Sequence, residues 1–218
     1  MTDVSPSLFI AFAAMIGFGL LLLAVVTTTS FVKISVVLFL LRNALGVQQS
    51  PPNIVLYAIA LILTVFVSLP LLRAEYVILA DVGAMKQGVE EWAEIAMRMQ
   101  APLKEQLLRF TPQVERDFFL DAAARLWPAD MRTADMTESL PVLVPSYLLG
   151  ELRRAFEIGF LLYLPFVVID LVITTILIAM GMSQVQPTTI AVPLKLLLFV
   201  LVEGWTRLLH GLVLSYAI

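Results

Sequence analysis

Charge is distributed very unevenly along this chain of 218 residues. It contains 14 lysines and arginines and 17 aspartates and glutamates, and 24 of these 31 side chains lie between Arg73 and Glu157. The other seven are spread over two long apolar blocks, so that 60% of the chain is hydrophobic and its mean hydropathy is +0.94. A soluble domain has about 25% charged and roughly 45–50% apolar residues, and could not bury so much apolar surface. The chain is therefore expected to be a membrane protein in which two apolar blocks flank a polar insert.

The composition also excludes several classes of protein. The chain has no cysteine and a single histidine, His210, so thiolate chemistry, disulfides and histidine-based metal sites are not expected. The net charge of −3 and the lack of a long basic run argue against nucleic acid as a partner. We therefore predict no catalytic, metal or cofactor-binding site, and we expect that the chain is not an enzyme.

The spacing of apolar residues predicts an all-α fold in three parts. Residues 1–72 are expected to form apolar helices, residues 73–157 a small helical insert outside the membrane, and residues 158–218 an apolar helical hairpin. Read as one helix, residues 7–42 would be about 54 Å long, which exceeds the roughly 30 Å of hydrocarbon in a bilayer. Either this helix breaks, with the Thr-Thr-Thr-Ser run at residues 27–30 as the natural place, or it projects beyond the membrane.

Threonine and proline residues mark the ends of helices in the insert and after it. Thr111 and Pro112 are typical of an N-cap and a first-turn proline, and the helix that follows should stop before Pro128. One apolar face of this helix is predicted to contain Val114, Phe118, Ala122 and Leu126. Pro145 is predicted to begin the next helix, which runs on into the last apolar block.

Asp170 is the most unexpected charge in the chain. It lies among the otherwise uncharged residues 158–180, and a charged side chain at the centre of a membrane helix costs about 2.5–3.5 kcal/mol. Lys195 follows 25 residues later, beyond a turn near Gln184. In a hairpin the two side chains would lie at similar heights, and they could pair within one chain or between neighbouring chains. A proton-relay role for Asp170 is the alternative.

Two further features of the hairpin carry predictions. Glu203 and Arg207 are four residues apart, the spacing at which opposite charges pair on a helix, and they are predicted to form a secondary ion pair. Met180 and Met182 occupy the turn, where polar residues are usual. A flexible thioether there suits either a soft contact that deforms and reseals or simple interfacial packing.

Three ordered motifs occur in the two apolar blocks. The first is ELRRAFEIGF at residues 151–160, followed by LPFVVIDLV at residues 164–172. The second is PLKLLLFVLVEGW at residues 193–205. The third combines TSF at 29–31, LRNALG at 41–46 and PPN at 51–53. Together these motifs resemble those of the FliP/SctR (YscR/HrcR-type) family, the core export proteins of flagella and type III secretion systems, whereas the insert matches only loosely.

This resemblance implies a pore-forming subunit of an inner-membrane export gate that passes unfolded secreted proteins into the secretion channel. The gate would be a helical ring of about five copies with two smaller membrane proteins of the same apparatus. It would be multi-pass, contact membrane lipid and project to the periplasmic side, where the insert would lie. Asp170 and Lys195 would then pair between adjacent subunits. The loop near residues 180–187 would correspond to the methionine gasket that closes the pore.

At this loop the chain departs from the family pattern. Flagellar members commonly carry consecutive methionines, whereas Met182 is followed here by Ser-Gln-Val-Gln. A gasket formed by Met180, Met182 and Gln184 would be more polar. The short N-terminus without a cleavable signal fits the virulence-associated injectisome branch better than the flagellar branch. The competing function is a small-solute transporter or proton channel that uses Asp170 and acts as a homo-oligomer alone.

Overall fold

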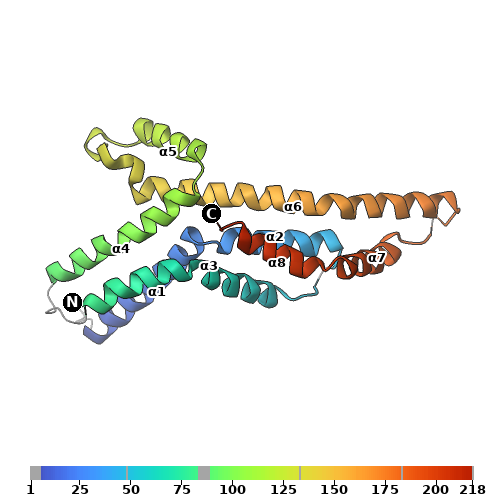
Figure 1. The fold of residues 1–218 in the computed structure, drawn as a ribbon, viewed down its shortest axis with the longest axis horizontal. Helices are drawn as coiled ribbons and strands as arrows, with labels where there is room; N and C mark the ends of the chain where they lie inside the picture. The colour runs from blue at the N-terminus through green and yellow to red at the C-terminus, as the bar shows by residue number, and fades with distance from the viewer. Residues whose placement is uncertain (1–5, 48, 83–88, 133, 183, 218) are drawn as a thin grey trace, which may run out of the picture.

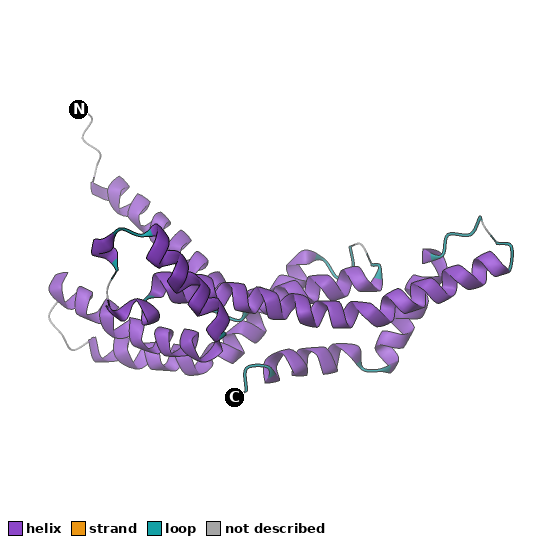
Figure 2. Ribbon diagram, turned by 90° about the horizontal axis from the view of Figure 1, so that it is seen from above, coloured by secondary structure: helices purple, strands orange, loops and turns teal. Residues whose placement is uncertain are grey.

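The computed structural model describes residues 6–47, 49–82, 89–132, 134–182 and 184–217. Throughout these residues the chain forms helices joined by loops and turns, with no strand (Figure 2). The predicted all-α fold is confirmed. The helices in chain order are α1 (Pro6–Thr28), α2 (Phe31–Leu45), α3 (Asn53–Val82), α4 (Val89–Phe110), α5 (Gln113–Leu126), η1 (Ala129–Met131), η2 (Ala134–Glu138), α6 (Leu140–Ala179), α7 (Thr188–Leu201) and α8 (Gly204–Leu214).

The first apolar run breaks where the threonines lie. Helices α1 and α2 are bent by 69° relative to each other. Thr28 Oγ1 donates to the carbonyl oxygen of Ala24 at 2.7 Å, and Thr29 Oγ1 donates to that of Val25 at 2.5 Å. Hydroxyl groups that bond back to the preceding turn satisfy carbonyls that the interrupted helix would otherwise leave free, and they favour a bend. The break therefore replaces the overlong single helix.

The core forms where α2 lies between α6 and the neighbouring helices. Ile34, Val37 and Leu38 on α2 are completely buried. Across from them, Gly159 allows α6 to approach closely, because a Cβ atom at this position would lie 2.2 Å from Leu40 Cδ1. The packed core of the chain therefore lies between α2 and α6. Figure 1 shows α6 as the long rod along which α2 lies.

Helix α6 is longer than predicted at its N-terminal end. The prediction that it begins at Pro145 is wrong, because the helix begins at Leu140 and has 40 residues. Val142 and Leu143 are buried, so tertiary packing extends the helix across a proline that the sequence pattern treats as a start. Both α3 and α6 run without interruption across the expected part boundaries at residues 72/73 and 157/158.

Within the insert, α5 ends before Pro128 as predicted, but the prediction for its N-terminus is wrong. Thr111 does not cap α5, since its Oγ1 donates to the carbonyl oxygen of Leu107 and so closes the end of α4. The predicted apolar face of α5 is not covered by this chain, because Val114, Phe118 and Leu126 are exposed. Periodicity identifies a face of a helix without identifying what covers it. The buried residues of α5 are Glu115 and Ala123.

Two helices are long and apolar enough to cross a membrane, Asn53–Ala80 and Leu140–Ala179. Two bent pairs also pass this test when each is taken as one span, α1 with α2 and α7 with α8. The described residues therefore contain two to four candidate spans, in agreement with the membrane protein that the composition predicts.

Candidate functional site

The helical hairpin of α6 and α7 brings Asp170 and Lys195 together. Lys195 Nζ lies 2.6 Å from Asp170 Oδ2 and also donates to the carbonyl oxygen of Ala44 at 3.1 Å. Lys195 is buried, whereas the Asp170 side chain is 45% exposed. The contact ties α6, α7 and the end of α2 together within one chain. A contact of these residues with an adjacent subunit stays a prediction.

The turn between α6 and α7 presents its methionines at the surface. Met180 is 66% and Met182 is 42% exposed, and Gln184 is exposed beside them. Helix α6 ends in the left-handed conformation that glycine favours, with Gly181 at φ +71°. Met182 N donates to the carbonyl oxygen of Leu177 at 2.9 Å and so closes this end of the helix. The turn projects from the end of the long α6 rod, away from the insert (Figures 1 and 2). The fold thus holds two exposed thioethers at one tip.

Behind this tip, the hairpin has its own small apolar core. Ile173 and Leu177 of α6 and Ala191 of α7 are buried against one another, and Val185 of the turn packs onto them. Because this core lies directly beside the turn, the positions of Met180 and Met182 are set by packed helices rather than by a free loop.

Glu203 and Arg207 form no ion pair in this structure. Both are exposed, and the contact between them is a backbone one, in which Arg207 N donates to the carbonyl oxygen of Glu203 at 3.1 Å. Glu203 is the residue before α8 and adopts φ 52° and ψ 41°, in the left-handed region. The rule for pairs four residues apart assumes that both residues are helical, and Glu203 does not meet this condition.

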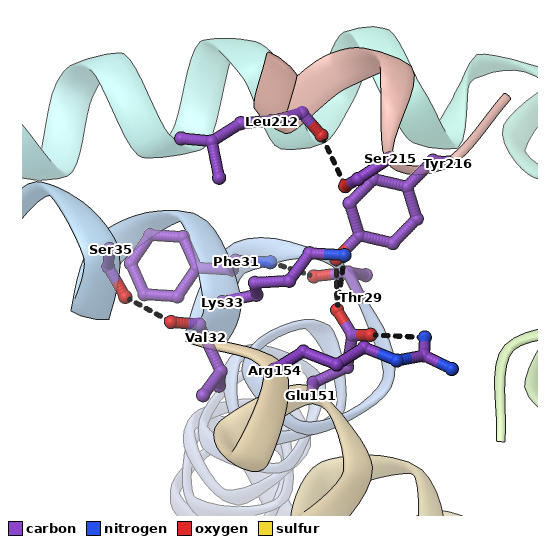
Figure 3. Close-up of polar contacts among 10 residues, drawn as sticks. All are labelled: Thr29, Phe31, Val32, Lys33, Ser35, Glu151, Arg154, Leu212, Ser215 and Tyr216. Atoms are coloured by element: carbon purple, nitrogen blue, oxygen red, sulfur yellow. Dashed lines mark hydrogen bonds and ion pairs between the residues drawn. The ribbon is translucent and has the colours of Figure 1, made fainter. Parts of the chain in front are cut away.

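A buried charged network that the sequence analysis did not identify lies where α2, α6 and the C-terminal segment meet. Lys33 and Glu151 are each 1% exposed, and Lys33 Nζ lies 3.5 Å from Glu151 Oε2. Arg154 Nη1 lies 3.3 Å from Glu151 Oε1. The Tyr216 hydroxyl donates to Glu151 Oε2, and Lys33 Nζ lies 3.5 Å from the centre of the Tyr216 ring (Figure 3). Two cations and a phenol thus share one carboxylate.

The ion pairs and the hydrogen bond of this network offset the free-energy cost of burying charged groups. A buried carboxylate is tolerated only when it is paired and hydrogen-bonded, and Glu151 has both kinds of partner. Burial, and next to it the charge of Glu151, raise the pKa of Tyr216 far above its ordinary value, so its hydroxyl stays protonated and able to donate. One signal was available in the sequence, since Lys33 is the lone charge of residues 4–41. Its partner was hidden, because Glu151 is 118 positions away.

A second polar contact joins the insert to α6. Arg153 Nη1 lies 3.5 Å from Glu115 Oε1 of α5, and Arg153 Nε lies 3.0 Å from Glu157 Oε1 on its own helix. Arg153 and Glu157 are largely exposed, so water screens their pairing and its contribution to stability is small.

Proteins of one family match this chain over nearly its whole length. The model of the FliP family matches residues 14–212. The probable translocation protein y4yL of Sinorhizobium fredii is 57% identical over 216 residues, which cover 99% of this chain and 97% of that protein. Yop proteins translocation protein R of Yersinia pestis is 48% identical, with 90% and 91% covered, and the hypersensitivity response secretion protein HrcR of Ralstonia nicotianae is 46% identical, with 92% and 94% covered. With a match over nearly its whole length, this chain belongs to the FliP family.

Proposed function

We propose that this chain is a pore-forming subunit of the inner-membrane export gate of a type III protein secretion system, and that unfolded substrates pass through it. Its relatives are named as translocation and secretion proteins, which supports a role as a component of a secretion apparatus. The observation that carries the finer proposal is the α6–α7 tip, where a rigid hairpin presents exposed methionines.

In the proposed gate, Met180, Met182 and Gln184 of several copies surround the constriction. Thioether side chains are apolar and have several rotatable bonds, so a ring of them can close against itself and then against a passing polypeptide. Gln184 adds a polar group that can accept or donate hydrogen bonds to an unfolded backbone. Asp170 and Lys195 lie further along the same hairpin and keep its two helices in register.

The proposed assembly contains about five copies of this chain and two smaller membrane proteins of the apparatus. Large apolar side chains cover the outer side of the hairpin, among them the exposed Leu161, Val168 and Leu171. An apolar surface of this kind needs lipid or a protein neighbour to cover it. We propose that neighbouring subunits cover much of it and that the assembled gate projects to the periplasmic side. We propose no catalytic role.

Co-expression tests this function against the competing transporter. The chain is produced with the two candidate gate proteins, extracted in detergent, and weighed by native mass spectrometry. A particle with a fixed ratio of all three proteins is the expected result. A homo-oligomer that forms without them and carries a pH-dependent solute or proton flux after reconstitution would instead support a transporter that uses Asp170.

Replacing Met182 with glycine is expected to make the closed gate leak small ions. The substitution removes a flexible side chain from the proposed constriction and leaves a gap in the seal. Conductance of reconstituted gates in planar bilayers measures the leak. Met131→Gly is the matched control, because Met131 is an exposed methionine of the insert, and it should leave conductance unchanged. Equal conductance of the Met182→Gly gate and the unaltered gate would remove Met182 from the seal.

A further inference from the structure

The junction of α7 and α8 holds two opposite charges that this chain does not pair. Glu203 and Arg207 are both exposed, and neither side chain has a hydrogen-bond or ion-pair partner among the described residues. The two helices together pass the length and hydropathy test for a membrane span. Charged side chains in such a segment are unfavourable unless a partner or water satisfies them. The two charges therefore need a partner from outside this chain, or water.

The geometry of the junction places Glu203 outside the helix that carries Arg207. Glu203 is held in the left-handed region, and α7 and α8 are bent by 62°. The next residue, Gly204, packs so closely that a Cβ atom would lie 2.2 Å from Phe199 Cε2. A non-glycine residue in this conformation is strained and persists only where its surroundings enforce it. Close packing of Gly204 on Phe199 constrains the backbone next to Glu203, and in this arrangement the two charges are not paired.

Apolar surface adjoins each of the two charges. Arg207 lines an open groove of about 460 Å³ between α6 and α8, together with apolar residues that include Ile158 and Leu208; Val202 of the α7–α8 junction also lines it. Just before Glu203, the last turn of α7 presents Val200 and Leu201, each 68% exposed. The junction thus offers an apolar projection, Val200 and Leu201, next to a carboxylate, and beside it an apolar groove that contains a guanidinium group.

We propose that the end of α7 of one copy docks in the α6–α8 groove of a second copy, where Glu203 of the first pairs with Arg207 of the second. The contact joins two different surfaces, so each copy offers both, and its repetition closes a ring when the rotation between copies permits. This inference rests on the proposed gate, in which several copies adjoin. It assigns Glu203–Arg207 to the contact between copies and leaves Asp170–Lys195 within each hairpin.

Thiol cross-linking tests the contact directly, because the chain contains no cysteine of its own. Two differently tagged copies, one with Glu203→Cys and one with Arg207→Cys, are co-expressed with the gate partners. Membranes are then treated with a short bis-maleimide, since an ion pair holds its backbones further apart than a disulfide permits. We expect a cross-linked dimer that carries both tags. Each variant expressed alone should give no dimer, and neither should Asp121→Cys, an exposed aspartate of α5, combined with Arg207→Cys.

Absence of the mixed dimer would overturn the inference, as would dimers of Glu203→Cys alone, which require a symmetric contact. If the three-protein particle still forms in that case, the proposed function stands and this contact alone is wrong. If no such particle forms even from the unaltered chain, the proposed function itself fails.

Charge reversal provides a second measurement. Glu203→Arg or Arg207→Glu alone places like charges together and should lead to loss of the assembled ring. The double variant restores an opposite pair and should recover the ring. No recovery would overturn the inference. It would also be overturned if Arg207→Glu kept the ring intact and only released anionic phospholipid that co-purifies with the unaltered protein, because the groove would then be a lipid site.

Discussion

Replacing Glu151 with alanine is expected to destabilise the folded chain by about 3–5 kcal/mol, the cost of leaving a buried charge without its partner. Lys33 is 1% exposed and would keep only the face of the Tyr216 ring, which cannot neutralise its charge. The Tyr216 hydroxyl would also lose its acceptor. Because the network joins α2 to α6, we expect these helices to separate at lower denaturant concentration. Unfolding in mixed detergent micelles measures this change.

Glu157→Ala is the matched control, since it removes a glutamate of the same helix that is paired with Arg153 in an exposed position. Its expected effect is about 0.3–0.5 kcal/mol. A double variant separates charge from volume. Lys33→Met with Glu151→Gln removes both buried charges and keeps similar shapes, so it should recover much of the loss. Equal effects of Glu151→Ala and Glu157→Ala would show that the network does not hold the core.

Asp170→Ala is expected to abolish secretion and to destabilise the hairpin by about 3 kcal/mol, near the lower end for a broken buried pair because the carboxylate is 45% exposed. Lys195 is buried and would keep a single neutral acceptor, the carbonyl oxygen of Ala44. Secretion of a substrate by cells that carry the variant, and the mass of the extracted particle, provide the two readouts. An intact particle with normal secretion would contradict the pairing.

Two variants sharpen this test. Asp121→Ala removes an exposed aspartate that pairs with Arg125 at 2.8 Å in the insert, and it should change little. Asp170→Asn combined with Lys195→Met removes the charges without leaving one unpaired. Recovery of assembly in this double variant would identify the role of the pair as structural, whereas lasting loss of a proton-dependent flux would support translocation through Asp170.

Local signals in the sequence were sufficient for the parts of the fold that depend on neighbouring residues. The hydroxyl-rich run marked the α1–α2 break because its side chains bond to carbonyls four positions away. Counting residues from the turn placed Asp170 opposite Lys195 because both helices of a hairpin rise by the same distance per residue. Features of this kind are determined within one element or one hairpin.

Features that depend on distant contacts were not accessible in the same way. No spacing rule connects Lys33 with Glu151, because the network forms only after α2 packs on α6. The left-handed conformation of Glu203 likewise occurs at a bend between two helices, which the periodicity of apolar residues does not predict. The start of α6 at Leu140 reflects burial of the residues that follow, which outweighs the usual meaning of Pro145.

The length of α6 has a mechanical consequence. Its 40 residues make a rod of about 60 Å, twice the thickness of the hydrocarbon layer. One end carries Met180, and the contact of Arg153 with Glu115 fastens the insert near the other end. A displacement of the tip is therefore expected to move the insert, because one continuous helix connects them. Pro165 removes one backbone hydrogen bond of α6 between these ends, so we expect the helix to bend most easily in the turn before it.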